Sequence, residues 1–132
     1  MEYKLEWKIP KRVLLAEVSG DVTLEDLRIF NADVVHHLDD GIGPVHLISM
    51  GENIRHVPTN LMQIRSIINY IHHPDIGWTI VVKPKTNRLT EFMLSVTAKA
   101  TGMQLEQVKN LGHGIEVLKK LDESLRCDNS PV

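Results

Sequence analysis

The sequence lacks the features that mark secreted, membrane-spanning and nucleic-acid-binding proteins. Its 132 residues include a single cysteine, Cys127, so no internal disulfide can form and we expect a reducing, cytoplasmic setting. No apolar run reaches the ~20 residues of a transmembrane helix, and the alternating charges of Met1 to Glu6 are unlike a signal peptide. Aromatic residues make up only 5% and the formal net charge is -2. We therefore predict no integral membrane segment and no nucleic-acid partner.

Catalytic and metal-binding motifs are missing as well. The sequence contains no Gly-x-Ser-x-Gly turn and no nucleotide-binding glycine fingerprint. Four of the seven histidines form two pairs of consecutive residues, His36-His37 and His72-His73. Consecutive side chains on a helix point in different directions and cannot readily bind one metal ion. We predict no catalytic residues, no metal site and no cofactor. A small hydrolase using Ser49 and His56 remains an alternative, because a serine nucleophile needs a base beside it.

The composition is that of an ordinary globular protein, with 42% hydrophobic and 24% charged residues. A chain of this length buries roughly two-thirds of its unfolded surface when it folds and needs no disulfides or bound metals to be stable. We predict one domain over residues 1–125 and a flexible polar tail over residues 126–132.

The first segments predict a hairpin followed by a helix. Tyr3–Ile9 alternates apolar and charged residues, which is the period of a strand with one wet face. Arg12–Ser19 is a second, more buried strand, and the short link between the two requires an antiparallel pair. Thr23 suits the N-cap of a helix that ends at Gly41.

The remaining segments alternate strands and helices. A third strand, Val45–Met50, leads into a loop from Gly51 to Asn60 and a helix that starts near Thr59 and runs to Ile71. Further strands are expected at residues 77–82 and 103–108, and helices at residues 89–100 and 115–121. The order ββαβαβαβα predicts an α/β fold in which a mixed five-stranded sheet carries helices on both faces.

This succession resembles the SpoIIAA-like proteins, relatives of the STAS domains and of the Sec14-like lipid-binding domains. The resemblance covers roughly residues 5–125 and rests on the element order, on the segment GDVTLEDL at residues 20–27 and on GIEVLKKL at residues 114–121. It implies a regulatory protein that binds other proteins. In the sigma-factor antagonists the third strand leads into an Asp-Ser-Ser/Thr-Gly run with a phosphorylated serine. That motif is absent here, and the hydroxyl groups in its region, Ser49 and Thr59, are the candidate phosphorylation sites.

The carboxyl ends of the parallel strands are the expected place for a ligand. Basic residues outnumber acidic ones in the loops expected there, and the helix starts would present free backbone N–H groups to an anion. Solvated loop charges are the alternative explanation. The candidate ligand-binding residues are Arg55, His56, Lys83, Lys85, Arg88 and His113.

Together these patterns favour a non-enzymatic regulatory or protein-interaction module of the STAS-like type. Its expected partner is another protein, with a small anionic ligand at the carboxyl edge of the sheet. The alternative is a Sec14-like binding protein for a lipid or other small apolar ligand. A homodimer is also compatible with the sequence.

Overall fold

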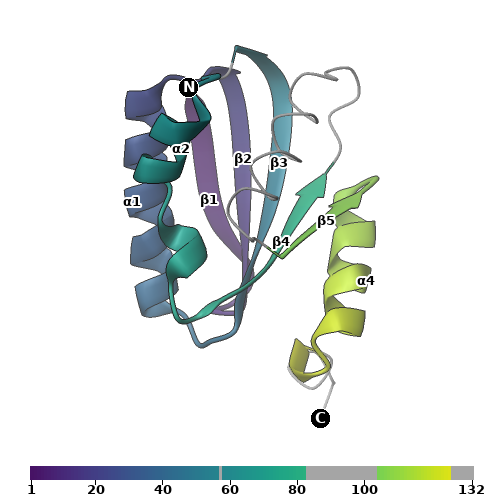
Figure 1. Cartoon of the computed structure of the whole chain (residues 1–132). Coiled ribbons are helices and arrows are strands. Elements are labelled where there is room, and N and C mark those ends of the chain that lie inside the picture. The colour runs from purple at the N-terminus through teal and green to yellow at the C-terminus, as the bar shows by residue number, and fades with distance from the viewer. Residues whose placement is uncertain (57, 83–103, 126–132) are drawn as a thin grey trace.

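The computed structural model describes residues 1–56, 58–82 and 104–125. They form one five-stranded sheet with helices on both faces (Figure 1). The strands lie side by side in chain order, β1 (Glu2–Ile9), β2 (Val13–Asp21), β3 (Val45–His56), β4 (Ile76–Val82) and β5 (Leu105–Val108). β1 is antiparallel to β2, and β2 to β5 are parallel. The predicted α/β fold with a mixed sheet is confirmed.

Two separate cores lie against the two faces of the sheet. Helix α1 (Leu24–Asp40) and helix α2 (Leu61–Ile67) cover one face, and helix α4 (Leu111–Leu121) covers the other (Figure 1). Alternate residues of the central strands serve the two cores, because successive side chains of a strand point to opposite faces. Leu47 packs with α1, for example, and Ile48 packs with α4.

Helix α1 follows its sequence signals closely. Thr23 caps it in a reciprocal capping box with Asp26, and Gly41 is its C-cap, as predicted. Phe30, Val34 and Leu38 form its buried stripe. The hairpin of β1 and β2 and the helix after it were therefore readable from residue pattern alone.

The predicted loop after the third strand is wrong. β3 continues through Gly51 to His56, because β2 also runs on to Asp21 and pairs with it through irregular register. Their pairing ends where the backbone N–H of Val22 donates to the His56 carbonyl, at 2.9 Å. Long-range pairing thus overrode a polar sequence with no clear alternation.

Two helix boundaries also differ from the prediction. The N-cap of α2 is Asn60 and not Thr59, and the helix ends at Ile67 before a separate turn, η1 (Tyr70–His72). Helix α4 begins at Leu111, one turn before the predicted start at Ile115, because the Asn110 side chain accepts a hydrogen bond from the His113 N–H.

The helix predicted at residues 89–100 and the tail predicted at residues 126–132 lie outside the described residues. Within the described ranges, no helix has both the length and the apolar character that crossing a membrane requires.

Candidate functional site

The carboxyl ends of β2 and β3 form an exposed corner that holds two of the predicted site residues. Arg55 and His56 are the last residues of β3, and His56 lies opposite Asp21 of β2. The Arg55 guanidinium donates to the Asp21 carboxylate at 3.3 Å, with the two side chains 70% and 54% exposed. An ion pair so exposed is weak. The Arg55 guanidinium therefore keeps donors facing water, which a ligand can reach.

Each helix start described along this edge has a side-chain cap that occupies one of its backbone N–H groups. Thr23 and Asp26 cap α1, and the amino group of Met1 lies 3.2 Å from the Asp26 carboxylate. Hydrogen bonds from Thr23 hold the Asp26 pKa below its usual value. Asn60 and Asn110 cap α2 and α4 in the same way. An anion at this edge would therefore have to be held mainly by basic side chains.

His113 lies farther along the same edge. His113 is exposed in the first turn of α4. Helix α4 follows β5, and β4 separates β5 from β3. At ordinary strand spacing the ends of β3 and β5 are therefore about 10 Å apart. Lys83, Lys85 and Arg88 lie outside the described residues, so their part in the site stays a prediction.

The two candidate hydroxyl groups occupy different environments. Ser49 is half-buried in the middle of β3, between Ala16 of β2 and Val81 of β4. Thr59 is exposed, immediately before the cap of α2. Of the two, Thr59 is the one that a modifying enzyme could reach without opening the sheet.

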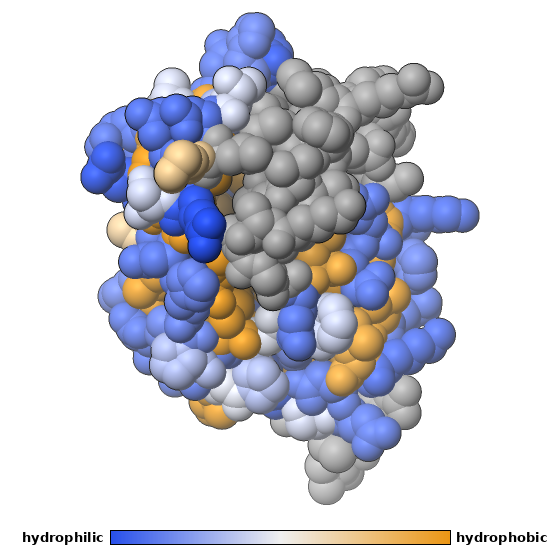
Figure 2. All heavy atoms as spheres, in the orientation of Figure 1, coloured by the Kyte–Doolittle hydropathy of each residue, from blue (hydrophilic) through white to orange (hydrophobic). Residues whose placement is uncertain are grey.

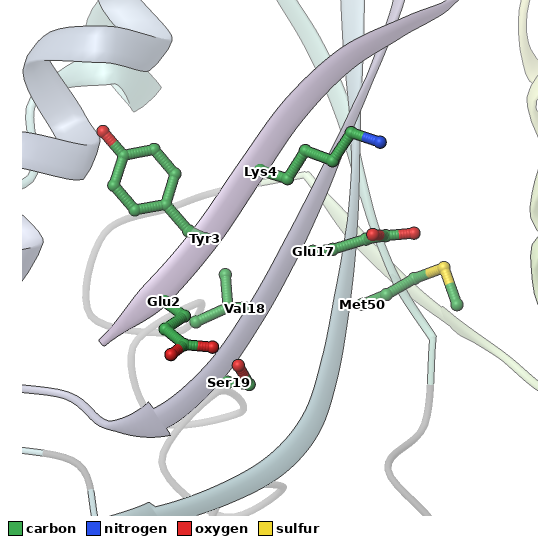
Figure 3. Close-up of a pocket in the computed structure, with 7 residues that line it drawn as sticks. All are labelled: Glu2, Tyr3, Lys4, Glu17, Val18, Ser19 and Met50. Atoms are coloured by element: carbon green, nitrogen blue, oxygen red, sulfur yellow. The ribbon is translucent and has the colours of Figure 1, made fainter.

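A shallow hollow of about 380 Å³ lies on the sheet surface, beside the first residues of β1 and the last residues of β2. In Figure 3 the side chains of Lys4, Glu17 and Met50 extend to one side of the sheet, while Tyr3 points to the other side, toward a helix. None of the predicted site residues lines it. The lining residues are Glu2, Tyr3, Lys4, Glu17, Val18, Ser19 and Met50. With two carboxylates against one ammonium group, the hollow does not suit an anion, and its charged lining does not suit a lipid chain.

The opposite, amino end of the parallel strands holds a buried polar cluster that sequence reasoning missed. The Asp122 carboxylate accepts hydrogen bonds from Arg12, at 3.0 Å, and from the Nε2 of His46, at 2.8 Å. Ser124 donates to the same carboxylate at 2.6 Å and accepts from Arg12 at 2.6 Å. We call Arg12, His46, Asp122 and Ser124 the amino-end cluster. It joins the residues after α4 to the first residues of β2 and β3.

Burial sets the electrostatics of this cluster. His46 is 2% exposed, and its burial lowers its pKa although the nearby Asp122 opposes that shift. Burial disfavours the charged form of Asp122, but hydrogen bonds from Ser124 and His46 outweigh it and hold the Asp122 pKa below its usual value. Asp122 is thus a carboxylate facing the Arg12 guanidinium and a neutral imidazole.

The amino-end cluster is not a catalytic triad. Both ring nitrogens of His46 are in use, because Nδ1 accepts the Trp78 backbone N–H at 2.9 Å while Nε2 donates to Asp122. Ser124 contacts Asp122 and Arg12, and no hydrogen bond joins it to His46. A serine nucleophile needs a base that can take its proton. The one sequence signal for the cluster was a histidine inside an apolar strand.

The described surface carries no broad apolar patch in the view of Figure 2, where hydrophilic residues dominate and hydrophobic ones show between them. Its exposed large hydrophobic side chains lie on different elements. They are Ile29 on α1, Ile42 after it, Met62 on α2 and Leu121 on α4.

Comparison with known proteins finds a similar structure but no similar sequence. No family model matches the chain, and no curated protein matches it either. Among solved structures, the chain is similar to the anti-sigma factor antagonist SpoIIAA in its unphosphorylated form. The likeness has a TM-score of 0.58 at 10% sequence identity and covers 90% of this chain and 97% of SpoIIAA. The protein has the SpoIIAA fold.

Proposed function

We propose that the protein is a regulatory module of the SpoIIAA type, which works by binding another protein in the cytoplasm and catalyses no reaction. The observation that carries this proposal is the fold, which is shared with an anti-sigma factor antagonist over nearly the whole of both chains. The arrangement of the described polar groups agrees with it. The histidine that is best placed in a polar cluster, His46, has both nitrogens engaged in holding the fold.

The binding surface we propose is the carboxyl edge of the sheet, with Arg55 and His56 at its described corner. Both residues are exposed, and Arg55 is held only by a weak ion pair to Asp21. Lys83, Lys85, Arg88 and His113 would extend the surface. Such a basic edge suits an acidic segment of the partner, or a small anion such as phosphate.

We propose Thr59 as the site at which phosphorylation regulates this surface. The residue is exposed and stands one position before the N-cap of α2. A phosphate there would add negative charge beside the proposed basic edge and alter its attraction for an acidic partner. Ser49 is half-buried between two neighbouring strands and is the weaker candidate.

The test is affinity capture from the native host cytoplasm, followed by binding assays with each purified candidate partner. We expect a specific partner whose affinity for the double variant Arg55→Glu/His56→Glu falls about tenfold or more, because the edge changes sign. Arg28→Glu is the control, since Arg28 is similarly exposed (65%) but lies on α1. A partner that binds all three proteins equally would place the interaction elsewhere.

Small-ligand binding is measured separately by nuclear magnetic resonance, with inorganic phosphate as the probe. Amide shifts confined to residues 55–60, 83–88 and 113 would support an anion at the carboxyl edge. Unchanged spectra at millimolar phosphate would rule out that part of the proposal and leave protein binding to the capture experiment.

A further inference from the structure

The first strand of the sheet has a free edge. β1 is the outermost strand, and within the described ranges it pairs only with β2 (Figure 1). It is eight residues long, and its pairing with β2 is regular from Glu2 to Trp7, with one register shift before Ile9. An edge of this kind presents a row of unpaired backbone N–H and C=O groups that another strand can bind.

The two faces of β1 differ completely in character. Tyr3, Leu5 and Trp7 point toward α1 and are partly buried against its core. The alternate residues Glu2, Lys4, Glu6 and Lys8 lie on the other face and alternate in sign. Lys4 is 67% exposed and Lys8 is 36% exposed, and each lies near Glu6 of the same strand, at 3.5 and 3.1 Å. Ion pairs at such exposed positions are weak and can be exchanged. The charged row is therefore available to a neighbouring strand as well as to water.

This charge pattern is complementary to itself when it is reversed. In an antiparallel pair of two β1 strands with Leu5 opposite Leu5, Glu2 lies opposite Lys8 of the second copy. Lys4 then lies opposite Glu6 of the second copy, and Tyr3 opposite Trp7 on the other face. Directly opposite residues in an antiparallel pair share a face and are close enough to interact. This register forms four ion pairs, two of each kind, and two aromatic pairs.

Neighbouring registers are disfavoured by the same residues. Centring the pair on Lys4 places Lys4 opposite itself and Glu2 opposite Glu6. Centring it on Glu6 places Glu6 opposite itself and Lys4 opposite Lys8. Like charges directly opposite are destabilising, and a slip of one residue sets charged side chains against apolar ones. Only the Leu5-centred register satisfies every charge.

The side chains on the apolar face of β1 are already held in place by contacts with α1. The Tyr3 hydroxyl donates to Asp33 of α1 at 3.0 Å, and its ring packs edge-on against Phe30. The Trp7 ring lies 5.9 Å from the His37 ring. These contacts hold the strand against α1 without using its free edge, so little ordering is left for association.

We propose that β1 is a self-association surface through which two copies of this chain pair antiparallel about Leu5, extending the two sheets into one. The occupant is a second copy and not another protein, because the charge row is complementary to its own reverse. A two-fold axis through Leu5 closes the assembly at two chains, since each copy has one β1 edge.

The test is sedimentation velocity on the full chain and on two charge-reversal variants. Wild-type protein is expected to form a reversible dimer that weakens as salt is added. Lys4→Glu places glutamates opposite each other, and Glu6→Lys places lysines opposite each other. Each variant alone should therefore dimerise about tenfold or more weakly than wild type. Lys120→Glu is the control for Lys4→Glu, because it makes the same charge reversal at an exposed position of α4. It should dimerise as wild type does.

Mixing the two variants gives the sharpest result. A Lys4→Glu chain beside a Glu6→Lys chain restores opposite charges at both positions, so the equimolar mixture should form a one-to-one dimer that neither variant forms alone. This recovery also shows that both variants are folded. Monomeric wild type at millimolar concentration, full dimerisation of either single variant, or no dimer in the mixture would each overturn the proposal.

Discussion

The two ends of the parallel strands are held together by opposite means. At the amino end, Arg12 and His46 are buried, and both donate hydrogen bonds to Asp122, whose side chain is only 14% exposed. At the carboxyl end, Arg55 and Asp21 form an ion pair that is more than half exposed. Buried polar groups are costly to leave unpaired, whereas exposed ones lose little. The comparison teaches that the amino end maintains the fold, while the carboxyl end can change residues or bind ligands without unfolding the protein.

The largest effect is expected from Asp122→Ala. The change leaves the Arg12 guanidinium and the His46 ring buried without their shared acceptor. We expect a loss of about 3 kcal/mol or more in the free energy of unfolding, measured by urea denaturation. Asp21→Ala, at the other end of the same sheet, is the matched control. Equal losses for the two aspartates would refute the contrast between the ends.

A methyl group added at Gly77 tests the packing of the amino-end cluster. A Cβ atom there would overlap the Nδ1 of His46, so Gly77→Ala must displace the ring that accepts the Trp78 N–H. We expect a loss of about 1–3 kcal/mol by urea denaturation. Gly112→Ala in α4 meets only the Asn110 side chain, at 3.4 Å, and should be neutral or slightly stabilising. A stable Gly77→Ala protein would mean that His46 is loosely held.

The pH dependence of stability separates His46 from the exposed carboxyl end. Burial lowers the His46 pKa in the folded protein, so the unfolded chain binds a proton that the folded chain refuses. Stability should therefore fall as pH drops below about 6.5, the ordinary histidine value. His46→Gln should flatten this part of the profile, while Arg55→Gln at the exposed carboxyl end, where arginine does not titrate in this range, should leave it unchanged. Urea midpoints measured between pH 7.5 and 5 decide the outcome.

The smallest effect is expected from Arg55→Gln. Its ion pair with Asp21 is exposed, so the free energy of unfolding should change by less than about 0.5 kcal/mol. The same substitution should still weaken binding of an acidic partner if the carboxyl edge is the binding surface. Measuring stability and binding on one protein shows whether the two properties are separable there.

Sequence patterns located most elements because local signals and tertiary packing agreed. The charge alternation of β1, the cap at Thr23 and the apolar stripe of α1 each require only neighbours along the chain. The boundary after Met50 failed for the opposite reason. The strand continues there because β2 provides a partner, and no local pattern records a partner thirty residues away.

The candidate sites divide in the same way. The positions of Arg55 and His56 near the carboxyl edge follow from strand order, because the ends of parallel strands share one edge. Their pairing with Asp21 required the register between β2 and β3. The roles of Lys83, Lys85 and Arg88 stay predictions.

By itself, the sequence determined the α/β class, the hairpin start and the self-complementary charges of β1, all of which are properties of residue order. Only the tertiary structure decided which polar residues are buried together. Arg12, His46 and Asp122 are far apart in the chain and meet because α4 returns across the sheet to its amino end. The hydrogen bonds among them offset the cost of their burial and are stronger at low dielectric, a condition that exists only once the fold has closed around them.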